Sequence, residues 1–202
     1  MVGLAFQYVS WMIPVKRVIR NKDIFVFRHP QPCYNHHLIL SPKRPVRNLQ
    51  QMAAAHLNGY LSKIWMAAMD VYEKQSDVYK SFKLVANGGK YQEVQQVHFH
   101  LFTTCSAMKD WNCDVRDGEI FDRNDQICIF EHPCPEREIH FVLKPVRTSQ
   151  EAYFQNVLQS IDLLDQRFQI VQKGYSLVYQ HKPQKTDQKI PVFHVLSGPK
   201  RV

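Results

Sequence analysis

The sequence lacks the long apolar run of a membrane protein. No apolar stretch among its 202 residues approaches the roughly 20 residues that a membrane-spanning helix needs. We therefore expect a soluble or peripheral protein without a transmembrane segment.

Cysteine is present, but its spacing is not typical of a disulfide framework or a metal site. The five cysteines are odd in number, and no two of them form a CxxC pair. This argues against both a disulfide scaffold and a zinc site. We expect no metal and an intracellular, reducing compartment.

The common glycine-rich and nucleophile motifs are absent as well. The chain has no GxxxxGK[ST] loop, no GxGxxG turn and no GxSxG elbow, and Asn87-Gly88-Gly89 is a lone tight turn. These absences exclude P-loop, Rossmann-type and α/β-hydrolase signatures. We expect no bound cofactor.

Acidic residues are scarce in the first half. Residues 1–110 hold 14 Lys and Arg against 6 Asp and Glu, whereas residues 111–202 hold 12 of each, so the whole excess of +8 lies in the first half. This favours an anionic ligand, nucleic acid or an acidic protein partner there. A solvated basic face is the alternative. The acid-free stretch before Asp23, with four basic residues, also faintly resembles a mitochondrial targeting segment.

What the sequence does contain is a repeat. Residues 24–44 and 127–147 match at a constant offset without a gap, and two of the matched types are His and Pro. The matched pairs are Ile24/Ile127, Phe27/Phe130, His29/His132, Pro30/Pro133, Pro32/Pro135, His37/His140, Leu40/Leu143, Pro42/Pro145 and Arg44/Arg147. Repeats of this kind usually pack on one another. We predict two modules, 1–110 and 111–202, that form an intrachain pseudo-dimer.

The order of predicted elements repeats too. In the first module, strands at 24–27 and 37–40 precede an amphipathic helix with apolar positions from Leu49 to Ala68, then strands at 82–86 and 93–103. In the second, strands at 127–130 and 140–143 precede a helix around 154–164, then strands at 168–171, 175–179 and 191–196. Thr148 and Glu151 fit a capping box. Residues 105–125 are predicted to be a linker.

Several segments together resemble the histidine-triad (HIT) superfamily. HLILSP, FKLVANGG and QEVQQVHFHLF stand in the family's order, with the long helix after the first of them. The resemblance implies an α+β fold of two HIT-like modules, each an antiparallel sheet with one long helix. It also implies hydrolysis or transfer of nucleoside phosphates.

The triad of the family lies on its final strand, where alternate residues point to one face. By resemblance, Gln96, His98 and His100 take the three positions. His98 is then the nucleophile that attacks the α-phosphate, His100 contacts phosphate or orients the ring, and Gln96 donates a hydrogen bond but carries no proton. The spacing leaves a second register open, with His98, His100 and Phe102 as the triad and His100 as the nucleophile.

Other positions of the predicted pocket follow from the same resemblance. His37 matches a histidine that supports the triad from behind, and Asn87 matches an asparagine that approaches the phosphate or sugar. His29 replaces an acidic residue that binds ribose, and Glu93 replaces a hydroxyl residue at the leaving group. A carboxylate at this place would repel phosphate.

The second module lacks the nucleophile. Val192 takes its position and Ile190 takes the first triad position, while His140 and His194 remain. We expect these two histidines to be satisfied core residues.

Two functions of different classes therefore stay open. One is a nucleotide phosphohydrolase or nucleotidyltransferase that acts through His98. The other is a catalytically inactive HIT-like pseudoenzyme that serves as a structural or regulatory subunit of a larger complex, for example mitochondrial or ribonucleoprotein, in which the basic first half contacts protein or RNA.

Overall fold

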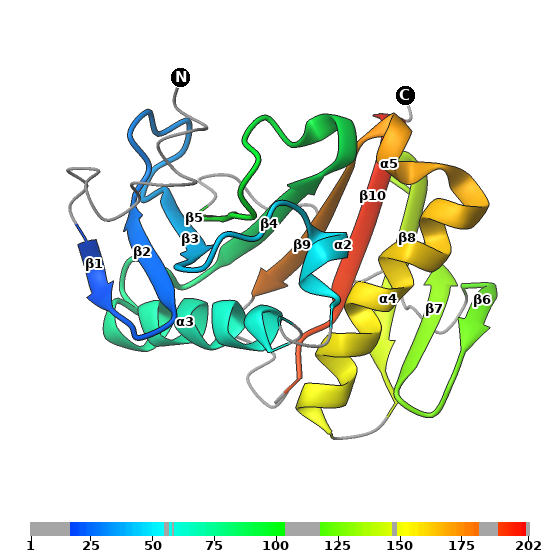
Figure 1. Cartoon of the computed structure of the whole chain (residues 1–202), viewed down its shortest axis with the longest axis horizontal. Helices are drawn as coiled ribbons and strands as arrows, with labels where there is room; N and C mark the ends of the chain where they lie inside the picture. Colours follow the sequence, from blue (N-terminus) through cyan, green and yellow to red (C-terminus); the bar gives the residue numbers. More distant parts are fainter. Residues whose placement is uncertain are drawn as a thin grey trace.

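One antiparallel sheet runs through the whole molecule (Figure 1). The computed structural model describes residues 17–54, 57, 59–103, 118–146, 149–181 and 190–200. Its ten strands are β1 (Arg17–Arg20), β2 (Ile24–Arg28), β3 (Leu38–Pro42), β4 (Phe82–Gly88), β5 (Phe99–Thr103), β6 (Ile120–Arg123), β7 (Ile127–Glu131), β8 (Arg137–Pro145), β9 (Tyr175–His181) and β10 (Phe193–Lys200).

The order of the strands is the same from either edge. It reads β1-β2-β3-β5-β4 from one edge and β6-β7-β8-β10-β9 from the other. The two central strands, β4 and β9, pair along their full length, from Phe82 opposite His181 to Gly88 opposite Tyr175. The first and second halves of the chain therefore share one continuous sheet.

Helices cover one face of this sheet. They are α2 (Leu49–Met52), α3 (Tyr60–Lys74), α4 (Gln150–Phe168) and α5 (Ile170–Lys173), with a short 3-10 turn η1 (Gly89–Tyr91) after β4. In Figure 1, α3 lies along the first half and α4 along the second. Side chains of α3, α4 and alternate strand residues form one core cluster that spans both halves.

The core explains why α4 forms where it does. It buries Phe154, Val157, Leu158, Ile161 and Leu164 completely, and these positions follow the spacing of one helical face. Full burial of each such side chain stabilises the fold by about 1.5–3 kcal/mol. Ser149 stands at the N-cap position without a side-chain hydrogen bond, and Thr148 of the predicted capping box lies outside the described residues.

The prediction of an α+β fold with a large antiparallel sheet is confirmed, and some elements need correction. The predicted helix over 49–68 is two helices, because α2 ends at Met52 and α3 begins at Tyr60, with Gly59 as its N-cap. Glycine weakens helix interiors. The predicted strand over 168–171 is wrong. Gln169 takes a left-handed conformation that ends α4, and α5 follows.

Two further corrections concern strands. Residues 120–123 were expected in a linker but form edge strand β6, which the Asn124 side chain connects to β7 by accepting hydrogen bonds from the amides of Gln126 and Ile127. The predicted strand over 93–103 begins only at Phe99. The boundary at residue 110 and the pseudo-dimer stay predictions. Across the described residues, none of the helices has the length and hydrophobicity of a membrane span.

The open face of the sheet carries a buried histidine cluster in the second half. The rings of His132 and His140 stack with centroids 4.1 Å apart, and Nε2 of His140 lies 3.0 Å from Nδ1 of His194. The amide of Glu136 donates to Nδ1 of His140. Because that nitrogen accepts, the neutral ring carries its proton on Nε2 and donates it to His194.

Burial keeps His140 and His194 neutral. It lowers the pKa of His140 to about 2, with smaller contributions from His194 and His132. It also lowers the pKa of His194 to about 3, with smaller contributions from His132 and Lys83. His140 and His194 are thus hydrogen-bonded and buried, as expected from the sequence.

We predict that acid destabilises the fold through these rings. Since their folded pKa values lie below the unfolded value of about 6.5, the unfolded state binds more protons below pH 6.5. The free energy of unfolding should be level above pH 7 and fall as the pH decreases through 6.5. Each ring contributes up to about 1.4 kcal/mol per pH unit. Urea unfolding of His140→Gln between pH 7 and 5 should show a shallower pH slope than the unsubstituted protein.

The exposed His36 provides the control, because it lies outside the cluster. His36→Asn should keep the original slope. Equal slopes for all three proteins would contradict the assignment.

Candidate functional site

His98 lies at the point where the loop after η1 enters β5. Its Nδ1 is 2.8 Å from the backbone carbonyl oxygen of Gln96. A carbonyl oxygen can only accept, so Nδ1 carries the proton and Nε2 keeps its lone pair. The backbone of the loop therefore fixes the tautomer of His98 in the form that a nucleophile requires.

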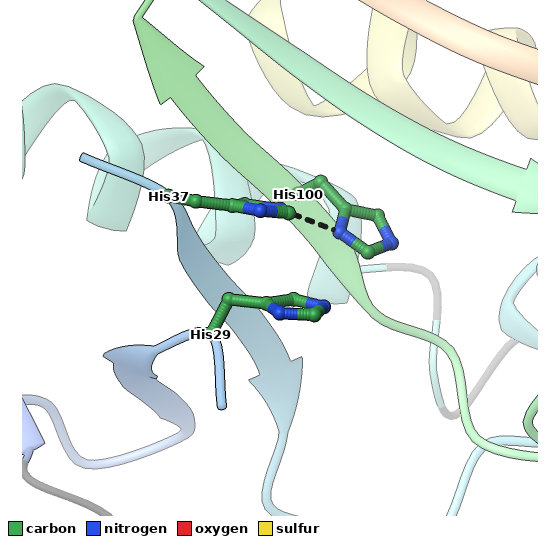
Figure 2. Close-up of side chains that lie close together, drawn as sticks. All are labelled: His29, His37 and His100. Carbon is green, nitrogen blue, oxygen red and sulfur yellow. Dashed lines mark hydrogen bonds between the residues drawn. The ribbon is translucent and has the colours of Figure 1, made fainter. Parts of the chain in front are cut away.

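His100, two residues further on, belongs to a three-ring group with His37 and His29. Figure 2 shows the rings of His29 and His37 stacked and His100 beside them. The stacked centroids are 4.2 Å apart, and Nε2 of His37 lies 2.9 Å from Nδ1 of His100. The group repeats the arrangement of His132, His140 and His194 ring for ring. His100 thus corresponds to His194.

This correspondence bears on the two registers of the triad. If His194 matches His100, then Val192 matches His98 and Ile190 matches Gln96, as in the register that makes His98 the nucleophile. In the other register, His100 would take the nucleophile position although its Nδ1 already faces His37. The geometry favours the first register.

Burial shapes the protonation of the site. Together with the electrostatic effect of the neighbouring histidines 98, 37 and 29, which acts in the same direction, it lowers the pKa of His100 to about 3. It lowers the pKa of His37 to about 4, helped by His29. Burial also lowers the pKa of His98, while the bond to Gln96 and the charge of Glu93 act in the opposite direction. At neutral pH the rings of His37, His98 and His100 are uncharged.

The side chain of Gln96 forms hydrogen bonds to the end of β3 and the segment after it. It is buried, its Oε1 accepts from the amide of Val46, and its Nε2 donates to the carbonyl oxygens of Pro42 and Arg44. The amide group therefore anchors the loop to the segment after β3. Gln96 reaches the site through its backbone carbonyl, which holds His98.

Asn87 precedes the loop, and Glu93 lies within it. Asn87 stands on β4, and the hydroxyl of Ser176 donates to its Oδ1 over 2.8 Å. Glu93 is exposed, yet close enough for its charge to raise the pKa of His98 against the larger effect of burial. The sequence did not single out Ser176, because its contact depends on the pairing of β4 with β9.

The two histidine groups also satisfy the distance requirement of a metal site. Within each group, one ring nitrogen per residue lies within 4.8 Å of the others. The ring orientation does not suit a cation. The stacked rings are parallel within 12° and 9°, so their in-plane lone pairs point in parallel directions and do not converge on one ion. Backbone amides also donate to Nδ1 of His29, His132 and His140, which places their protons on Nε2. The groups fit neutral, hydrogen-bonded rings better than metal ligands.

A cavity of about 330 Å³ opens beside the cluster of the second half. Three carboxylates line it, those of Glu119, Glu131 and Glu138, together with His132 and His140. These acids would repel a phosphate group. The cavity is therefore a poor candidate for a phosphate site.

Comparisons with known protein families match the first half of the chain. Residues 11–106 match the model of the HIT domain. No curated protein sequence matches the chain.

Solved structures resemble the chain over both halves. A DUF4931 family protein from Bacillus cereus covers 91% of this chain and 85% of its own, with 13% identity and a TM-score of 0.63. A GalT-like protein from Arabidopsis thaliana covers 99% and 83%, with 11% identity and a TM-score of 0.62. A uridylyltransferase mutant covers 91% and 79%, with 12% identity and a TM-score of 0.60.

At these identities the likeness concerns the fold alone, and it extends across the continuous sheet rather than one half of it. The sequence resemblance is confirmed for the first half, while degeneration of a second module stays a prediction. Residues 11–106 therefore match the HIT domain, within a fold that spans both halves.

Proposed function

We propose that the protein binds a nucleotide and cleaves or transfers it through His98. The observation that carries this proposal is the bond between Nδ1 of His98 and the carbonyl of Gln96, which leaves Nε2 unprotonated. His100 supplies the complementary group. If His37 donates to its Nδ1, as His140 does to His194, then His100 presents an N–H to a phosphate oxygen.

The reaction proceeds in two displacements. Nε2 of His98 forms a bond to the α-phosphorus, and the bond from that phosphorus to the leaving group breaks. Water, or the oxygen of a second acceptor, then attacks the nucleotidyl-histidine and releases the ring. Water gives hydrolysis and another acceptor gives transfer. Because a uridylyltransferase shares the fold across both halves, both outcomes are worth testing.

The site favours leaving groups that need no proton. Gln96 carries none, and its amide is occupied by the segment after β3. A phosphate or polyphosphate departs as an anion, whereas an amine requires protonation. We therefore propose phosphoanhydrides as substrates in preference to phosphoramidates.

The division of the chain belongs to the same proposal. Residues 1–110 and 111–202 are two diverged copies of one module that pack as a pseudo-dimer, and only the first retains the nucleophile. The symmetric strand order and the repeated histidine group support this reading.

A second candidate is a pseudoenzyme that binds without turnover, as a subunit of a larger assembly. The observation that favours it is the carboxylate of Glu93 beside His98, since its charge opposes phosphate binding. Turnover of nucleotides separates the two candidates.

We predict that His98→Ala abolishes turnover of dinucleoside polyphosphates. Loss of the nucleophile should lower kcat/KM by at least about a thousandfold, measured by chromatography of the products. His36→Asn is the matched control at an exposed histidine and should retain full activity. Activity that persists in His98→Ala would exclude His98 as the nucleophile. Absence of turnover by the unsubstituted protein would favour the pseudoenzyme.

We further predict that Glu93→Gln tightens ligand binding. Removal of one negative charge near the phosphates should lower KM, or the Kd of an unreacted nucleotide, about two- to tenfold at low salt. The gain should shrink when the ionic strength rises, because salt screens exposed charges. Calorimetric titrations at two salt concentrations measure this. An unchanged or raised Kd would show that Glu93 does not face the phosphates.

A further inference from the structure

The first site borders directly on the second half of the chain. Strand β4 of the first half pairs with β9 of the second, and Asn87 stands opposite Ser176 in that pairing. On the other side of β4, Val85 stands opposite His100 of β5. A residue of the second half is thus two strands away from the predicted triad.

Alternation along the strands places these residues on the same face. Leu84 and Ala86 belong to the core beneath the helices, so Val85 and Asn87 point to the opposite face. His98 and His100 point there as well, because Val97, Phe99 and Leu101 belong to the core cluster and His100 pairs with Val85. The pairing of β4 with β5 ends at Ala86 opposite Phe99, so Asn87 and His98 are the next residues along the two segments.

The contact between the halves is a specific hydrogen bond. The hydroxyl of Ser176 donates to Oδ1 of Asn87 over 2.8 Å, and both side chains are half-buried. With its oxygen held by Ser176, the amide of Asn87 keeps its two N–H groups for another acceptor. An amide turned the other way would present an oxygen, which repels phosphate.

We infer that Ser176 of the second half is a positioning residue for the first site. It holds Asn87 so that the amide N–H groups meet the phosphate or sugar oxygens of a nucleotide bound at His98. This inference rests on the proposed function and adds that the site is incomplete without the second half.

The loop that leads to His98 depends on the second half in the same way. Gly89 has a φ of +57° and packs so closely on α5 that an added Cβ would lie 2.1 Å from the carbonyl oxygen of Val171. The ring of Tyr91 lies against Gly174, and its hydroxyl donates to the carbonyl of Gly198 over 3.3 Å. Asn87 and the start of the loop that leads to His98 are therefore both held by the second half.

The test uses the full chain with four test variants and the control variant Ser62→Ala. The test variants are Ser176→Ala, Ser176→Thr, Asn87→Ala and the double variant of the two alanine substitutions. Loss of one hydrogen bond corresponds to about a three- to tenfold change. We expect Ser176→Ala to lower kcat/KM by that factor without lowering Tm appreciably. Ser176→Thr keeps the hydroxyl and should stay within about twofold of the unsubstituted protein. Ser62→Ala, which removes another half-buried hydroxyl in α3, should have no effect.

The double variant separates positioning from a structural role. If Ser176 acts through Asn87, Ser176→Ala should have no further effect once Asn87 is alanine. The inference is overturned if the kcat/KM losses of the two single variants multiply in the double variant. It is also overturned if the protein is active and Ser176→Ala leaves kcat/KM unchanged. If the unsubstituted chain neither binds nor cleaves dinucleoside polyphosphates, the proposed function fails and the inference fails with it. That outcome can be told apart from the one in which the enzyme is active and Ser176→Ala leaves kcat/KM unchanged.

Discussion

The pairing of β4 with β9 is the interaction on which the rest of the structure depends. Seven residue pairs join the two halves of the chain there, and the sheet continues through them to both edges (Figure 1). Without that pairing, each half would expose a central strand with unpaired backbone groups. The helices α3 and α4 could not share one core cluster if the strands beneath them were separate.

The same pairing gives the second half a role that its own side chains do not suggest. At the position that matches His98 it has Val192, together with a three-ring histidine group of the same geometry as that of the first half. This group packs on the open face. In the first half, His98 adds to that group a ring with a defined tautomer. We propose that chemistry resides in the first half and that the second half supports it.

Much of this could be predicted from the sequence, and the reasons are local. The repeat of His29 and His37 at 132 and 140 indicated the paired strands. The stacking of the histidine rings was not predicted, because it depends on how separate strands come together. The helical spacing from Phe154 to Leu164 predicted α4. The edge strands β1 and β6 were missed because each is only four residues long and has no alternating pattern. The role of Ser176 could not be predicted, since it follows from the register between strands that are far apart in the sequence.

The central claim is that Nε2 of His98 attacks phosphorus, and a covalent intermediate tests it most directly. The protein would be mixed with a dinucleoside polyphosphate, quenched in base, in which phosphohistidine bonds survive, and analysed by intact and peptide mass spectrometry. The account predicts one added nucleoside monophosphate, located on the peptide that contains His98. An active enzyme that forms its adduct on another residue, such as His100, would contradict it.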